Sequence, residues 1–221
     1  MASNTYADMT PEELRRPLMA AMLNHVAFDG WTTIALNAAA SDMSISPEMA
    51  ELAYPRGAIE VLEEHLIVAD EQLLTALTAL DLPSMKIRER ITVAIRTRLE
   101  QNISNREAVR RGLATLALPH HVAAGSKALW RTADTMWRAA GDTSTDHNWY
   151  TKRATLSAVY SAVLLYWLND TSENFENTWA FLDKRIEDVM KIEKAKFQVR
   201  KMCENMPSLS RFLGRLRYPG V

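Results

Sequence analysis

The chain has 221 residues, 7 of them Gly, and its 26 Lys and Arg are nearly balanced by 27 Asp and Glu. Good helix formers dominate and no run of alternating β-branched residues occurs, which excludes a sandwich, a barrel or a doubly wound sheet and predicts an all-α protein. The charge balance also excludes the basic footprint over the whole chain that is typical of nucleic-acid-binding proteins.

Features that report on cellular compartment are few. The single cysteine, Cys203, allows no disulfide within the chain, so we expect a reducing compartment. Residues 1–8 lack the basic and apolar regions of a secretory signal and are not Arg-rich enough for a transit peptide. The longest uncharged stretch, residues 154–169, is too short to span a bilayer comfortably and carries polar Thr155, Ser157 and Ser161, so it predicts a buried core helix.

The first elements form a small head. Residues 11–28 predict a helix, because Thr10 suits the N-cap, Pro11 suits the first helical position and acidic residues follow in the first turn. Two short helices are expected at 31–40 and 47–53, with a turn between them. Together these elements predict a helix-turn-helix head over residues 1–57.

The head resembles that of the TetR family of repressors. The resemblance is carried by Gly30–Trp31–Thr32–Thr33, Ala38–Ala39–Ala40, Met43–Ser44–Ile45–Ser46, Leu52–Ala53–Tyr54 and Leu62. Between Trp31 and Tyr54 there is no Lys or Arg, whereas three acidic residues give this segment a net charge of −3. Because counterion release by basic residues supplies most of the affinity for DNA, we expect a degenerate head that binds no nucleic acid. A ligand-responsive repressor is the alternative.

A helical body is predicted over residues 58–200, with helices at 58–80, 84–100, 105–118, 121–140, 148–168 and 175–199. It has more apolar side chains than a thin bundle needs, which indicates either an ordinary core or a pocket for an elongated apolar ligand such as a polyprenyl tail. Each buried methylene of such a ligand would contribute ~0.8 kcal/mol. The predicted lipid-binding residues are Ile95, Leu99, Leu113, Leu116, Trp130, Trp137, Leu156, Val159, Tyr160, Val163, Leu164 and Phe181.

The segment 142–150 places two large aromatic residues directly after a polar loop, at the start of a helix. Neighbouring residues on a helix point about 100° apart, so Trp149 and Tyr150 cannot both face the same line of the core. We therefore expect one or both near the surface, where aromatic side chains are typical interface anchors. The alternative is that both are half-buried and close the end of the bundle.

Catalytic motifs are missing from the sequence. It contains no P-loop, no GxSxG and no HExxH, and no Glu stands three residues before any His, as a di-iron site in a bundle would need. His120 and His121 are adjacent and diverge on a helix, which makes a shared metal ion unfavourable. We therefore expect no enzyme, no metal and no cofactor. A cofactor-free enzyme is the second alternative.

The C-terminal segment is basic on an otherwise acidic chain. Residues 191–217 hold 8 basic and 2 acidic residues, a net of +6, which leaves −7 for the remainder. A short helix at 207–218 would place its apolar residues within an arc of about 100° with arginines around it, the pattern of a helix lying on an anionic membrane. We predict a membrane-binding unit at 201–221 that acts through Leu209, Arg211, Phe212, Leu213, Arg215 and Leu216. Docking on the protein's own bundle or on a second copy is the alternative.

Two strings in the body resemble the lipid-binding accessory protein family of coenzyme Q (ubiquinone) biosynthesis. They are residues 116–120 with 136–153, and Phe175–Glu–Asn–Thr–Trp–Ala–Phe–Leu182 followed by Arg185. The resemblance covers roughly residues 12–200. It implies a TetR-like homodimer, with no catalytic residues, that binds quinone intermediates or other lipids in a hydrophobic pocket.

The same resemblance implies a partner and a location. The partner is the di-iron demethoxyubiquinone hydroxylase, and the implied docking residues are Met136, Asp146, Trp149 and Tyr150. The chain starts almost directly at its first helix, so we expect a bacterial member, peripheral on the inner face of the inner membrane. For a eukaryotic member the corresponding place is the matrix face of the mitochondrial inner membrane.

Overall fold

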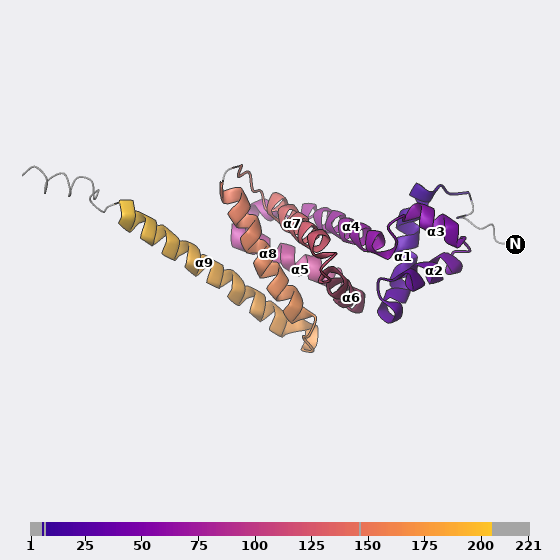
Figure 1. Cartoon of the computed structure of the whole chain (residues 1–221). Helices are drawn as coiled ribbons and strands as arrows, with labels where there is room; N and C mark the ends of the chain where they lie inside the picture. Colours follow the sequence, from indigo (N-terminus) through magenta and orange to yellow (C-terminus); the bar gives the residue numbers. More distant parts are fainter. Residues whose placement is uncertain (1–5, 7, 146, 205–221) are drawn as a thin grey trace, which may run out of the picture.

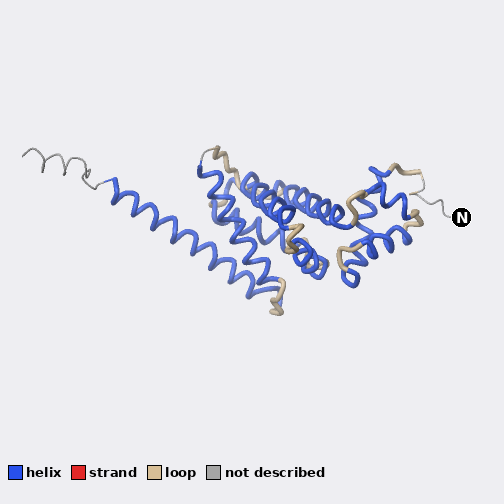
Figure 2. Tube along the Cα trace, viewed as in Figure 1, coloured by secondary structure: helices blue, strands red, loops and turns tan. Residues whose placement is uncertain are grey.

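The computed structural model describes residues 6, 8–145 and 147–204, and the regular structure within them is helical (Figures 1 and 2), which confirms the all-α prediction. The α-helices are α1 (Pro11–Asp29), α2 (Thr33–Asp42), α3 (Pro47–Ala53), α4 (Ala58–Thr78), α5 (Ile87–Glu100), α6 (Arg106–Leu116), α7 (Val122–Ala139), α8 (His147–Trp167) and α9 (Glu176–Glu204). Two 3₁₀ turns, η1 (Leu82–Ser84) and η2 (Glu173–Phe175), precede α5 and α9.

Local capping explains where α1 begins and ends. The Thr10 hydroxyl accepts a hydrogen bond from the Glu13 backbone N–H at 3.3 Å, and the Glu13 carboxylate accepts one from the Thr10 N–H at 2.8 Å. This capping box satisfies two backbone donors that the first turn leaves free. At the other end Gly30 has φ +69°, a left-handed conformation that favours glycine and stops the helix. The predicted first helix is thus confirmed almost to the residue.

The head packs around one core built from α1, α2, α3 and the first turns of α4. Buried residues from all four helices meet there, among them Leu18, Leu36, Ala50 and Leu62. Trp31 connects this head to the rest of the chain, because its indole N–H donates to the Ala108 carbonyl of α6 at 3.0 Å. The head is therefore fastened to the body by a buried hydrogen bond as well as by α4.

The body packs around a second core, formed by α5, α7, α8 and the second half of α4. In Figure 1 the first half of α9 runs beside α8, and its second half continues past the end of the bundle. Among the described helices, none has a stretch both long enough and apolar enough to cross a membrane.

Some sequence predictions fall outside the described residues. They are the docking residue Asp146 and the membrane residues Leu209, Arg211, Phe212, Leu213, Arg215 and Leu216. The unit boundaries at residues 57 and 200 also stay predictions.

Helix α4 contributes to both cores, through Leu62 at its start and Leu73 further along.

Candidate functional site

A cavity of about 440 Å³ lies between α5, α8 and α9. Three of the predicted lipid-binding residues line it, namely Trp137, Leu156 and Val159. Further apolar side chains come from α5 and α9, and Lys86, Arg88 and Lys152 are basic residues of its wall. We call this cavity the α8–α9 groove; the remaining apolar lining residues are Ile87, Ile91, Ile186, Val189 and Met190.

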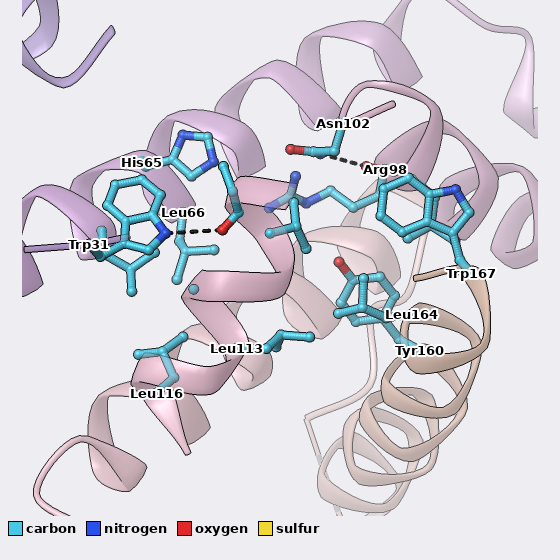
Figure 3. Close-up of a pocket in the computed structure, with 15 residues that line it drawn as sticks. Trp31, His65, Leu66, Arg98, Asn102, Leu113, Leu116, Tyr160, Leu164 and Trp167 are labelled. Atoms are coloured by element: carbon cyan, nitrogen blue, oxygen red, sulfur yellow. Dashed lines mark hydrogen bonds between the residues drawn. The ribbon is translucent and has the colours of Figure 1, made fainter. Parts of the chain in front are cut away.

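A second, smaller cavity of about 60 Å³ lies between α4, α5, α6 and α8, next to Trp31 of the head (Figure 3). The predicted residues Leu99, Leu113, Leu116, Tyr160 and Leu164 line it. The sequence predicted one pocket, and the structure corrects this to two cavities. The physical reason is the helix geometry of α8, on which Val159 and Leu164 lie about 140° apart and so face different neighbours.

The other four predicted lipid-binding residues line neither cavity. Ile95 and Val163 are fully buried in the body core. Trp130 belongs to a cluster of aromatic rings on α7 and α8. Phe181 of α9 stacks on Tyr166 of α8, with ring centroids 4.5 Å apart. Apolar periodicity identified them as inward-facing, but it could not separate core from cavity wall.

The predicted aromatic pair forms a cluster with Trp130, which we call the α7–α8 aromatic cluster. Trp149 lies 5.6 Å from Trp130 and 4.7 Å from Tyr150, measured between ring centroids. Tyr150 is 61% exposed, whereas Trp149 is half-buried. Met136 is fully buried in the body core, so the expectation that it forms part of an exposed docking patch is wrong. It lies on the inner face of α7.

A buried charge network holds the α7–α8 aromatic cluster in place. The Arg153 guanidinium is almost completely buried and pairs with Asp134 at 2.6 Å and Asp142 at 2.9 Å. It also lies 4.2 Å from the centre of the Trp149 ring, a cation–π contact. Lys152 completes the network by donating to Asp142 at 2.7 Å. The buried ion pairs of Arg153 therefore orient Trp149.

Asp142 is the centre of this network. Burial by itself would raise the pKa of its carboxyl, but hydrogen bonds from Lys152, Ser144 and Arg153 outweigh that effect and hold the pKa well below its usual range. Asp142 is therefore ionised at any physiological pH. Neither Arg153 nor Asp134 was predicted as a site residue. The sequence does contain a signal for Arg153, because its spacing from Leu156 and Tyr160 puts all three residues on the buried face of α8.

A second ionic cluster lies beside the small cavity, which Arg98 lines, and it too was not predicted from the sequence. Asp70 of α4 and Arg98 of α5 are 5% and 4% exposed, and their nearest charged atoms are 3.7 Å apart. His65 of α4 lines the same cavity and its ring lies 5.4 Å from that of Trp31. No local pattern marks these three positions, because their partners are on other helices.

Comparison with known proteins agrees with the resemblance found in the sequence. The family described as COQ9 matches residues 122–193. A human protein named "Ubiquinone biosynthesis protein COQ9, mitochondrial" is 32% identical over 203 residues, 87% of this chain and 63% of its own length. The rat protein of the same name is 32% identical over 202 residues, 87% of this chain and 64% of its own length. The chain thus spans less than two thirds of these relatives.

A solved structure supports the fold. The TetR transcriptional regulator from Nitrosomonas europaea superposes with a TM-score of 0.66, over 79% of this chain and 96% of the regulator, at 20% sequence identity. At that identity the similarity shows a shared architecture. The predicted TetR-like fold is therefore confirmed.

Proposed function

Since this chain is a COQ9-like protein with a TetR-like fold, we propose that it is a non-enzymatic lipid-binding protein of ubiquinone biosynthesis. Its relatives are named for that pathway, and the observation that carries the lipid-binding part is the α8–α9 groove beside the α7–α8 aromatic cluster. The two sites share a boundary, because Asn148, Thr151 and Lys152 of the groove alternate with Trp149 and Tyr150 along the first turns of α8.

The groove suits an elongated apolar ligand such as an isoprenoid quinone intermediate. Its volume of about 440 Å³ lies within the usual range for ligand pockets, and most of its lining is apolar. Met190 on α9 supplies a flexible side chain that can repack around a ligand. A lipid that moves from the bilayer into this groove exchanges one apolar environment for another, so the free-energy change of transfer is small.

The α7–α8 aromatic cluster is the proposed docking site for the di-iron demethoxyubiquinone hydroxylase. Tyr150 is the exposed anchor, and its ring packs edge-to-face against the ring of Trp149 at a centroid distance of 4.7 Å. Exposed tyrosines on a rigid base are frequent hot spots of protein interfaces. A partner bound there would lie next to the mouth of the groove and receive the head of its lipid.

Membrane association and dimerisation complete the proposal. Residues 201–221 carry the basic and apolar residues predicted to bind an anionic membrane surface, and the second half of α9 extends past the end of the bundle (Figure 1). For a homodimer the exposed side of α8 is suitable, because Leu165 and Tyr166 are 57% and 40% exposed there. Neighbouring exposed apolar side chains indicate an interface.

The repressor alternative is not favoured. On α3, the helix that would enter the DNA groove, Glu48 and Glu51 are exposed, and no basic residue lies between Trp31 and Tyr54. A DNA phosphate backbone would meet a negative face.

Lipid content tests the central claim. Mass spectrometry of an organic extract from natively purified protein is expected to find an isoprenoid quinone or another lipid. Val159→Trp places a large ring into the groove and should lower the extracted lipid severalfold. Ala154→Trp, at an exposed position of the same helix, serves as the matched control and should leave it unchanged. A lipid-free wild-type protein would contradict the proposal.

The docking claim is tested at Tyr150. Tyr150→Ala should reduce co-purification of the hydroxylase at least ~10-fold, because truncating an aromatic hot spot costs about 2 kcal/mol or more. The fold should remain intact, since this side chain is largely exposed. Phe28→Ala removes an aromatic side chain that is 86% exposed on the distant head and should have no effect. If the hydroxylase co-purifies equally with both variants, the docking site does not lie on α8.

Vesicle binding tests the C-terminal segment. Deleting residues 206–221 should release the protein from vesicles that contain anionic lipid, because each basic residue near such a surface contributes ~1 kcal/mol. The full chain should co-sediment with these vesicles and, more weakly, with neutral ones. Undiminished binding of the shortened chain would place the membrane contact elsewhere in the protein.

A further inference from the structure

The small cavity has a buried, poorly partnered cation in its wall. Figure 3 shows the Arg98 side chain between Trp31 and His65 on one side and Tyr160 and Trp167 on the other. Arg98 is 4% exposed, and its Nε has no hydrogen-bond partner. Its nearest carboxylate oxygen, Oδ1 of Asp70, is 3.7 Å away, which is too far for a hydrogen bond.

Asp70 compensates the charge of Arg98 only in part, because the same carboxylate also pairs with Arg131. Oδ1 accepts from the Thr132 hydroxyl at 2.7 Å, and Oδ2 accepts from Nε of Arg131 at 2.8 Å. One carboxylate therefore serves two arginines, and the cluster has a net charge of +1. The other polar groups that line the cavity, including Asn102 and Tyr160, do not compensate it.

The titratable neighbours of Arg98 are neutral at pH 7. Burial, and secondly the charge of Arg98, lower the pKa of His65 to about 4. Burial also raises the pKa of the Tyr160 hydroxyl, so it keeps its proton. Neither group supplies a negative charge. Because a buried charge that is compensated only in part is costly, a further anion is the group that this cavity lacks.

We propose that this cavity binds a carboxylate at Arg98. The planar guanidinium fork matches the two oxygens of a carboxylate, and the cavity of about 60 Å³ has room for the carboxylate group beside Arg98. Leu66, Leu113 and Leu116 line the side of the cavity away from Arg98 (Figure 3), which suits a carboxylate that carries a short apolar chain. The site is separate from the α8–α9 groove, and its carboxylate could come from a free short acid or from the head of an acyl chain.

Binding of a matched pair of probes to the full-length protein tests the proposal. Hexanoate and hexanol, which share chain length and differ in charge, are titrated at pH 7.5 and low salt, with the dissociation constant measured by calorimetry. We expect hexanoate to bind at least ~10-fold more tightly than hexanol, as for hydrogen bonds to charged groups. Equal affinities, or no binding of either probe, would overturn the proposal. Acetate distinguishes the two sources of the carboxylate. If acetate binds as tightly as hexanoate, the ligand is a free small acid. If acetate binds more weakly than hexanoate, the ligand is the head of an acyl chain.

Variants locate the binding at Arg98. Arg98→Met should reduce the preference for hexanoate at least ~10-fold, whereas Arg96→Met, at an exposed position of the same helix that lines neither cavity, should preserve it. If Arg98→Met does not fold, Asp70→Asn is informative, because it removes the competing negative charge with little change of shape and should tighten hexanoate binding severalfold. Unchanged or weaker binding in Asp70→Asn, or an unchanged preference in Arg98→Met, would contradict the assignment. Val159→Trp, which fills the groove, should not alter hexanoate binding, so failure of this site and failure of the lipid groove give different results.

Discussion

Replacing Arg153 with Met will destabilise the protein by about 3 kcal/mol, although the methionine fills much of the same space. The guanidinium is buried, so its loss leaves Asp134 and Asp142 without their shared partner inside the fold. Removing one member of a buried ion pair costs about 3–5 kcal/mol. The lower end applies because Lys152 still pairs with Asp142 and Arg138 still pairs with Asp134. Urea unfolding at pH 7 measures the difference.

The matched control for this experiment is Arg138→Met. Arg138 pairs with the same Asp134 at 2.8 Å, but its side chain is 73% exposed. An exposed ion pair contributes about 0–1 kcal/mol, so this variant should unfold close to the wild type. Equal losses of stability in the two variants would contradict the expected difference between the buried and the exposed ion pair. The Arg153→Met variant should also weaken hydroxylase docking, because Trp149 loses its cation–π contact.

Acidification from pH 6.5 to pH 4 will reduce the stability of the fold by about 3 kcal/mol through His65. Burial lowers the pKa of this imidazole to about 4, against about 6.5 in the unfolded chain. Between these values the unfolded chain binds more protons, so the free energy of unfolding rises with pH at about 1.4 kcal/mol per pH unit. The contribution is fully present above pH 6.5 and is lost as the pH falls towards 4.

The variant that isolates this effect is His65→Phe. It keeps an aromatic ring next to Trp31, at the position where the imidazole lies 5.4 Å away, and it cannot titrate. Urea unfolding at pH 7.0, 6.0, 5.0 and 4.5 should show a smaller loss of stability in this variant than in the wild type. The same slope in both proteins would contradict the assignment to His65. Asp142 and Asp170 act in a lower window, since their lowered pKa values keep them charged until well below pH 4.

The helices were largely predictable because their limits depend on neighbouring residues. Thr10 caps α1 as predicted, and α3 has the predicted bounds, Pro47–Ala53. The helix predicted from residue 84 starts later, at Ile87, because Pro83 and Ser84 belong to the turn η1. A proline favours the first turn of any helix, so sequence could not tell a 3₁₀ turn from an α-helix there.

The candidate site was predictable in part. The exposed Tyr150 follows from its position beside Trp149 on a helix, because two adjacent residues cannot share one face. Met136 was a docking residue only by the family resemblance, and the packing of α7 places it in the body core. The division of the predicted pocket into two cavities could not be seen either, because it depends on which helix packs against each face of α8.

The amino-acid sequence by itself determined the helical fold class, the capped helix ends and the missing positive charge of the head, since these depend on composition or on residues within one or two turns. The tertiary structure decided which charges are paired and which are not. Arg153 meets Asp134 across 19 positions of the chain, and Thr132 meets Asp70 across 62. Such contacts form only when whole helices pack, and packing is also what withdraws Arg98 from water and leaves it beside an anion-sized cavity.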